Sequence, residues 1–281
     1  MLMSTNALDL SAYFERIGYA GESSASLHAL QHLQALHPGA IAFENLSSFS
    51  GEAVKIDLAS LMAKLVKSRR GGYCFEHNTL FYHVLSKLGF PVKRLMARVL
   101  WNISTDVVLP RTHMVLLVTC AGQDYLADVG FGGMTPTAPL RLDTAMAQAT
   151  PHESFRLIST DGFYTVEAEI GSVWKPLYVF DLQEQQPCDY ELTNWYVSNH
   201  PTSKFVTELI AALSKPKKRH TLLNAHYTIH HIDGTSDQKI LSTRDELLET
   251  LRTVFGIFPE DIPDISKKLD QALQASVSPS P

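Results

Sequence analysis

Cysteine is scarce in this chain. The 281 residues contain three, Cys74, Cys120 and Cys188, which are far apart in the sequence. An odd number of scattered cysteines fits neither a disulfide framework nor a zinc ribbon, so we expect reduced thiols. The three histidines between positions 226 and 231 have no second ligand cluster at the usual zinc spacing. We therefore expect no metal site.

The chain also lacks a strong excess of charge and a long hydrophobic run. Lys and Arg number 24 against 29 Asp and Glu, for a formal net charge of -5, and no long block of one sign occurs. This balance does not favour nucleic acid as a partner. No uncharged apolar stretch approaches the roughly 20 residues that span a bilayer. The first ten residues also lack a basic segment followed by an apolar one. We expect a cytoplasmic protein with no membrane partner.

The chain does contain enough apolar sequence for a substantial core, because 45% of its residues are hydrophobic and 19% are charged. In the first ninety residues, apolar side chains recur at intervals of three and four, which predicts helices over about 10–17, 24–37, 58–66 and 74–88. We expect these helices to form one part of the protein, residues 1–91.

From residue 92 the period changes to two, which predicts strands and a small antiparallel sheet or barrel over residues 92–195. The last part, residues 196–281, has a mixed pattern. Its final expected helix follows Thr243, which has capping-box spacing to Glu246. We therefore expect an α+β fold in three parts. The strands are expected near 92–101, 113–120, 124–129, 154–159, 163–170, 225–232 and 239–241, and a helix near 203–213.

The most informative stretch is Arg70-Gly-Gly-Tyr-Cys-Phe-Glu-His-Asn78. Cys74 follows two glycines and begins an amphipathic helix, so a thiolate there would face the positive end of the helix dipole. Gly71 and Gly72 also remove side chains from the approach to the sulfur. The same pattern fits a small core residue behind a helix break, because free cysteine is among the most buried residue types.

A histidine and an acid follow on predicted strands. His113 heads an apolar strand, where a positioned imidazole can act as the base for a thiol. Asp128 lies before a glycine-rich turn, and a short hairpin would make the two strands neighbours. Because a buried carboxylate needs a partner, we expect Asp128 to contact His113 and fix its tautomer. Alone, His113 also fits a hydrogen-bonded structural residue, and Asp128 also fits a turn that binds backbone amides.

Together the three residues indicate a cysteine nucleophile. A cysteine at a helix start, followed by a strand histidine and then a strand acid, is the order found in papain-like and transglutaminase-like folds. This order leaves open whether the acyl group passes to water or to an amine.

Six blocks of the sequence resemble the arylamine N-acetyltransferase family, in the family's order. The resemblance implies a helical bundle, a β-barrel and an α/β lid around a core like that of cysteine proteases and transglutaminases. It also implies a Cys-His-Asp triad where the first two parts meet, and Cys74, His113 and Asp128 match those positions. The blocks are residues 43–45, 70–78, 112–114, 128–132, 174–180 and 194–205.

The resemblance also implies a ping-pong reaction. Acetyl-CoA acetylates the cysteine and leaves as CoA, and an arylamine or arylhydrazine then attacks the thioester. We accordingly expect acetyl-CoA and a small aromatic amine or hydrazine as partners, no metal, and a monomer or homodimer.

Other positions match the family with supporting roles. Phe43 and Phe131 match aromatic residues that line the acceptor pocket, and both also fit ordinary core phenylalanines. Glu44 and Arg70 match a salt bridge beside the site. The positions expected near the cofactor are Thr112, Gly130, Gly132, Gly133 and Phe205.

Other interpretations stay open at this point. A transglutaminase-like thiol hydrolase would share the triad but release acetate at a rate unaffected by an arylamine. A binding module or an amide synthase would hold a larger acyl chain and turn over little acetyl-CoA. The basic cluster Lys215-Pro-Lys-Lys-Arg219 fits a solvated loop, or a contact with the phosphates of CoA.

Overall fold

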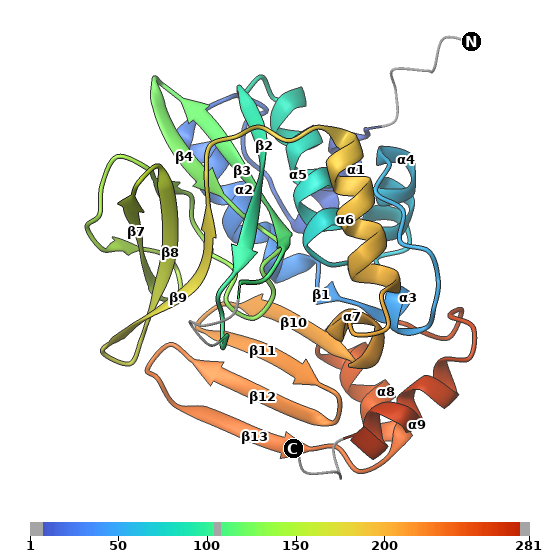
Figure 1. Cartoon of the computed structure of the whole chain (residues 1–281). Helices are drawn as coiled ribbons and strands as arrows, with labels where there is room; N and C mark the ends of the chain where they lie inside the picture. Colours follow the sequence, from blue (N-terminus) through green and yellow to red (C-terminus); the bar gives the residue numbers. More distant parts are fainter. Residues whose placement is uncertain (1–7, 104–107, 276–281) are drawn as a thin grey trace, which may run out of the picture.

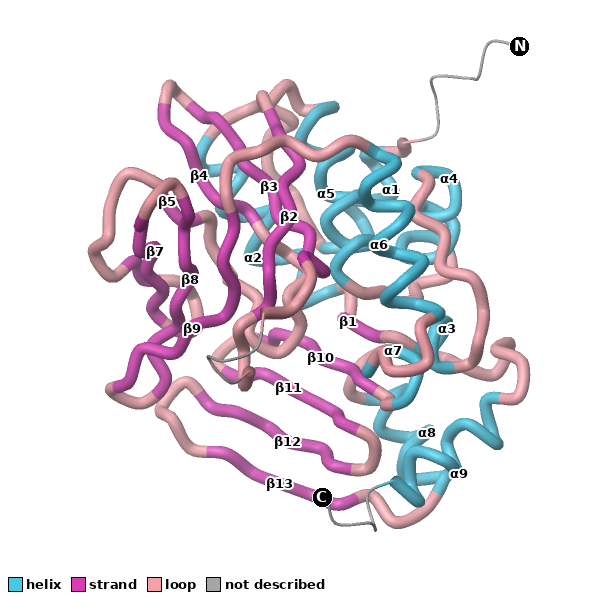
Figure 2. Tube along the Cα trace, in the orientation of Figure 1, coloured by secondary structure: helices cyan, strands magenta, loops and turns pink. Residues whose placement is uncertain are grey.

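The computed structural model describes residues 8–103 and 108–275, and it confirms an α+β fold in three parts (Figure 1). The N-terminal helices pack beside an eight-stranded antiparallel sheet that curls toward a barrel. A second, five-stranded sheet carries the C-terminal helices (Figure 2). The part boundaries at 91 and 195 stay predictions. None of the helices within the described ranges is long and apolar enough to cross a membrane.

The N-terminal helices follow the predicted periodicity closely. Asp9 caps the first helix by accepting the Ala12 N–H at 3.0 Å, and Gly18 ends it with a φ of 71°. Two details differ from expectation. The second helix continues through Pro38, where the Ile41 N–H still donates to the His37 carbonyl. The third becomes π-helical. The elements are α1 (Leu10–Ile17), α2 (Leu27–Ala40), α3 (Leu46–Phe49), α4 (Leu58–Leu61), η1 (Met62–Lys67) and α5 (Cys74–Lys87).

The larger sheet has the order β5-β4-β3-β2-β9-β8-β7-β6, and β5 at one edge lies against β7. All of its strand pairs are antiparallel, as predicted for this part of the chain. The strands are β2 (Val92–Val99), β3 (Arg111–Cys120), β4 (Gln123–Ala127), β5 (Leu140–Arg141), β6 (Gln148–Ala149), β7 (Ser154–Thr160), β8 (Phe163–Ile170) and β9 (Val173–Phe180).

Strand β3 is buried on both faces, which explains its nearly continuous apolar sequence. Met114 and Leu116 pack into the core of the N-terminal helices, whereas Val115 and Leu117 pack into the core of the larger sheet. Its hairpin to β4 pairs Cys120 with Gln123, so the two strands are neighbours as expected. This shared strand joins the helical part to the barrel.

The second sheet has the order β1-β10-β11-β12-β13, and its edge strand comes from the N-terminal part. In β1 (Phe43–Glu44), Phe43 pairs with Ala212. The core beneath combines N-terminal side chains such as Leu46 and Phe49 with the C-terminal helices. The remaining elements are α6 (Pro187–Asn199), α7 (Lys204–Thr207), β10 (Ile210–Lys215), β11 (Lys218–Leu223), β12 (His226–His231), β13 (Ser236–Ile240), α8 (Arg244–Thr253) and α9 (Ile265–Ala275).

Two expectations for this region were wrong. The helix expected over 203–213 is the short α7 followed by strand β10, because β10 can pair with β1 on one side and β11 on the other. The basic cluster is a hairpin rather than a solvated loop. Arg219 is only 1% exposed, and its guanidinium binds the carboxylate of Glu153 at 2.9 Å. A buried guanidinium needs such a partner.

Candidate active site

Cys74 is the first residue of α5, at the junction of the helical part and β3. Its Sγ donates to the Thr112 carbonyl at 3.6 Å. The residue is 4% exposed. The first turn of the helix places it near free backbone N–H groups and the positive end of the dipole, as the sequence predicts.

The glycines around Cys74 permit close packing. A Cβ at Gly71 would lie 2.0 Å from the Ala42 carbonyl oxygen, and one at Gly72 would lie 2.6 Å from Oε2 of Glu76. The expectation that these two glycines open the approach to the sulfur stays a prediction. Gly130 approaches the cysteine, since a Cβ there would lie 2.9 Å from its Cα.

His113 and Asp128 form the predicted contact. Nε2 of His113 lies 2.7 Å from Oδ2 of Asp128, and both side chains are buried. Asp128 lies immediately after β4, which ends at Ala127, so the acid begins the turn instead of lying within the strand. Because the carboxylate accepts the Nε2 hydrogen, Nδ1 of His113 is the nitrogen left for a second partner.

That second partner is Cys74. A hydrogen bond with the Cys74 side chain is among the interactions that raise the pKa of His113. The sulfur, the imidazole and the carboxylate therefore lie close together, although they come from α5, β3 and the turn after β4.

The pKa values of the pair favour charged forms. Burial lowers the pKa of His113, but the charge and hydrogen bond of Asp128, together with Cys74, raise it to about 10. Burial raises the pKa of Asp128, yet contacts with His113, Asn78 and the Gly130 N–H lower it overall. An imidazolium is therefore stable here at neutral pH, next to the Cys74 side chain.

Asn78 is a site residue to which the sequence assigned no role. Its Nδ2 donates to Oδ1 of Asp128 at 2.9 Å, and the Gly130 N–H donates to the same oxygen at 2.9 Å. Asp128 thus binds the turn amide of Gly130 as well as His113. Asn78 lies four residues after Cys74, a spacing that places both on one helix face.

Aromatic rings surround His113. The centroid of Phe131 lies 5.1 Å from that of His113, and the Tyr178 centroid lies 4.9 Å from it. The Tyr178 hydroxyl is buried, and burial together with the charge of Asp128 raises its pKa well above 10. Tyr178 lies in block 174–180, but its contact with His113 depends on strand pairing that the sequence does not reveal.

The other predicted aromatic positions lie on the α5 side. Phe43 stacks on His77 at a centroid distance of 6.3 Å, and Phe205 lies 6.1 Å from Phe43. A Cβ at Gly132 would come within 3.4 Å of the Phe43 ring. Phe205 also approaches Tyr73, the residue before the cysteine, at 5.4 Å. The aromatic residues expected at the site therefore border both sides of the junction.

The cofactor positions named from the sequence lie in the same region. Thr112 provides the carbonyl that faces the Cys74 thiol, and Gly130 packs against the backbone of that cysteine. Gly133 meets the second sheet, since a Cβ there would lie 3.1 Å from the Thr221 methyl. The glycine-rich turn thus connects the cysteine to β11, the middle strand of the second sheet.

The expected salt bridge beside the site is present. Arg70 contacts Glu44 at 2.9 Å, and Glu44 also accepts the Leu46 N–H at 2.6 Å. Burial raises the pKa of Glu44, but the Arg70 charge, the Lys64 charge and these hydrogen bonds lower it overall. The carboxylate is therefore ionised and holds β1 next to the glycines that precede Cys74.

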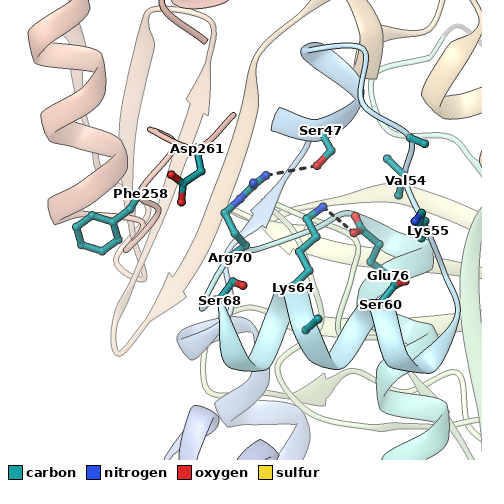
Figure 3. Close-up of a pocket in the computed structure, with 12 residues that line it drawn as sticks. Ser47, Val54, Lys55, Ser60, Lys64, Ser68, Arg70, Glu76, Phe258 and Asp261 are labelled. Atoms are coloured by element: carbon teal, nitrogen blue, oxygen red, sulfur yellow. Dashed lines mark hydrogen bonds and ion pairs between the residues drawn. The ribbon is translucent and has the colours of Figure 1, made fainter. Parts of the chain in front are cut away.

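A polar cavity lies next to the start of α5 (Figure 3). Its volume is about 460 Å³, and its lining includes Lys64, Arg70 and Glu76 but none of Cys74, His113 and Asp128. Among residues 8–103 and 108–275, no group of three or more His, Cys, Asp and Glu side chains is arranged to hold a metal ion.

Comparison with known proteins agrees with the resemblance seen in the sequence. A family model described as N-acetyltransferase matches residues 26–261. An arylamine N-acetyltransferase of Mycobacterium tuberculosis is 42% identical over 275 residues, which cover 95% of this chain and 96% of that protein.

Solved structures agree in fold. The arylamine N-acetyltransferase structure from M. tuberculosis has a TM-score of 0.90 and 40% identity, and the match covers 94% of this chain and 99% of that one. The Mycobacterium marinum arylamine N-acetyltransferase in complex with CoA has a TM-score of 0.90 and 40% identity, with coverage of 95% and 99%. The chain therefore belongs to the arylamine N-acetyltransferase family.

Proposed function

We propose that this protein transfers an acetyl group from acetyl-CoA to the nitrogen of an arylamine or arylhydrazine, with Cys74 as nucleophile, His113 as base and Asp128 as the orienting acid. The contact of the cysteine with a buried His113–Asp128 pair carries the proposal. Such a pair is what a thiol requires to act as a nucleophile.

In the first half-reaction, the Cys74 thiolate attacks the carbonyl carbon of acetyl-CoA. The carbon–sulfur bond to CoA then breaks, and the CoA sulfur receives the proton from the His113 imidazolium. The products are acetyl-Cys74 and CoA. Asp128 supports this step because its carboxylate holds the imidazole in the tautomer that presents Nδ1 to the sulfur.

In the second half-reaction, the acceptor nitrogen attacks the thioester carbon. His113 takes the proton that the nitrogen loses, and the bond between carbon and the Cys74 sulfur breaks. This regenerates the thiolate–imidazolium pair and releases the acetylated amine. Phe131 and Phe43 offer flat apolar surfaces that suit an aryl ring.

Five further residues are proposed to lie against acetyl-CoA, because they border Cys74, its neighbour Tyr73 or the turn that packs on Cys74. The CoA complex of the M. marinum relative supports CoA as the donor. The five are Thr112, Gly130, Gly132, Gly133 and Phe205. The proposal also includes a cytoplasmic location and a monomer or homodimer, which light scattering of the purified protein would distinguish.

Intact-protein mass spectrometry tests the function directly. Incubation with acetyl-CoA should add one acetyl group to the protein, and an arylamine or arylhydrazine should then remove it and appear as its acetyl derivative. Cys74→Ser should prevent the acetylation, whereas Cys188→Ser should not. Acetate release at a rate that arylamine does not change would instead identify a thiol hydrolase.

A further inference from the structure

Glu76 lies in the first turn of α5, two residues after Cys74. One carboxylate oxygen, Oε2, accepts the Tyr73 N–H at 3.0 Å and so caps the start of the helix. The other, Oε1, accepts a hydrogen bond from Nζ of Lys64 at 2.7 Å (Figure 3). The Glu76 side chain is 2% exposed and that of Lys64 is 22% exposed.

This arrangement creates an electrostatic conflict. The helix start gains a cap from the Glu76 carboxylate, but a buried negative charge within one turn of a thiolate opposes ionisation of the thiol. Burial and the nearby charge of Glu44 raise the pKa of Glu76 overall, although the Lys64 charge and the hydrogen bonds from Lys64 and the Tyr73 N–H lower it. The cap therefore needs a cation if it is to be compatible with a reactive sulfur.

Lys64 is the cation that contacts Glu76. It comes from η1, a π-helical segment, and its ammonium group lines the polar cavity. Arg70, which also lines this cavity, is already paired with Glu44. Lys55 and Asp261 line the same cavity at exposed positions.

Other titratable groups also lie near Cys74. His113 contacts it from β3 and is held by Asp128, while Tyr73 precedes it and Tyr190 of α6 is close enough for the Cys74 charge to raise its pKa. The two tyrosines are buried phenols whose pKa values lie above the usual one, so they remain neutral. Within α5, Glu76 is thus the negatively charged residue nearest to Cys74.

We propose that Lys64 is a positioning residue for Cys74: it cancels the charge of Glu76, so that the helix start is capped without suppressing the thiolate. This inference rests on the proposed function, because it takes Cys74 to be the nucleophile. It assigns a role in acetyl transfer to a residue on a different element from the three triad residues.

Alkylation of Cys74 by iodoacetamide as a function of pH, in the absence of acetyl-CoA, tests the proposal. Lys64→Met should move the midpoint of the alkylation rate against pH up by about one pH unit, because the charge of Glu76 is then no longer balanced by Lys64. Glu76→Gln should move the midpoint down, because Lys64 is then the unpaired charge. The double variant Lys64→Met with Glu76→Gln should return close to the wild-type midpoint.

The opposite signs separate electrostatics from damage to the helix, because a loosened helix start would shift both single variants in the same direction. Lys239→Met is the matched control, since Lys239 forms an exposed pair with Glu246 at 2.9 Å and should leave the midpoint unchanged. Circular dichroism would show that each variant is folded. Shifts of the same sign, or no shift in either single variant, would overturn the role of Lys64.

The proposed function can fail independently of this result. Alkylation reports on the sulfur alone, whereas acetylation in the mass-spectrometry experiment reports on the transferase. A protein that shows the opposite shifts but is never acetylated would retain the Lys64–Glu76 effect and lose the transferase assignment.

Discussion

Asn78 donates a hydrogen bond to Oδ1 of Asp128 at 2.9 Å, and it lies one turn after Cys74 on the same helix. Its Nδ2 also donates to the Met114 carbonyl at 2.7 Å, and its Oδ1 accepts the Val129 N–H at 3.0 Å. One buried amide therefore ties α5 to β3 and to the turn after β4. The sulfur and the carboxylate are held in place by core hydrogen bonds rather than by mobile loops.

Asp128→Asn should slow acetylation of Cys74 by a factor on the order of 10³ to 10⁴. The amide cannot balance an imidazolium, so burial would lower the pKa of His113 with only the contact with Cys74 to oppose it. Rapid-quench mass spectrometry with acetyl-CoA measures the rate. Asp143→Asn is the control, because Asp143 pairs with Arg141 on the surface. A rate within tenfold of wild type would show that the carboxylate is not needed.

Thiol labelling at about pH 6 should modify Cys74 before the other two cysteines. Cys188 is exposed and Cys120 is buried, with a pKa raised by burial, so exposure alone predicts that Cys188 reacts first. A thiolate paired with His113 should reverse that order, because the thiolate is the nucleophile. Peptide mass spectrometry after limited iodoacetamide treatment gives the order. Preferential labelling of Cys188 would contradict an activated Cys74.

Arg70→Met should destabilise the fold by about 3 to 5 kcal/mol, since it leaves the buried carboxylate of Glu44 without its cation. Urea unfolding followed by circular dichroism measures this change. Adding Glu44→Gln to the same chain should restore part of the loss, because the neutral amide is less costly to bury. Arg141→Met, which breaks an exposed pair, should change the unfolding midpoint little. Equal effects of the two arginine variants would refute the argument.

Two buried histidines should make the protein sensitive to acid. The Tyr13 hydroxyl donates to Nδ1 of His37, and Nε2 of His37 lies 2.8 Å from Nδ1 of His77. Nε2 of His77 faces the Ala42 carbonyl, which can only accept a hydrogen bond. Every hydrogen bond in this series from Tyr13 to Ala42 can therefore form when both imidazoles are neutral. Burial lowers the pKa of both rings, that of His77 to about 4.

Because these pKa values are lower in the folded chain than in the unfolded one, the unfolded chain binds more protons below about pH 6.5. Stability should therefore fall as the pH is lowered from about 6.5 towards 4, by about 1.4 kcal/mol per pH unit for each histidine. Urea unfolding at several pH values measures the slope. His77→Gln should reduce the slope, and His32→Gln, at an exposed position on α2, should not. A slope unchanged by His77→Gln would rule out this source of acid sensitivity.

Local patterns predicted the elements whose signals lie within a few residues. The helix predicted at 74–88 follows from two glycines and an apolar stripe, which are short-range features, and the structure has it at Cys74–Lys87. The strand at 210–215 was mistaken for a helix because its pairing with residues 43–44 lies far away in the sequence. Such pairing overrides local propensity, and a single sequence does not display it.

The amino-acid sequence alone determined the chemical identity of the site: one cysteine at a helix start, one histidine and one acid, in an order that permits thiol catalysis. Only the tertiary structure decided that Asn78 binds the acid, that Tyr178 packs on the imidazole and that Lys64 neutralises Glu76. These contacts join elements that are distant in the chain, and their geometry depends on how the helices and both sheets pack into their shared cores. The sequence determines which side chains are present, whereas the distances and charges that set their pKa values depend on the tertiary structure.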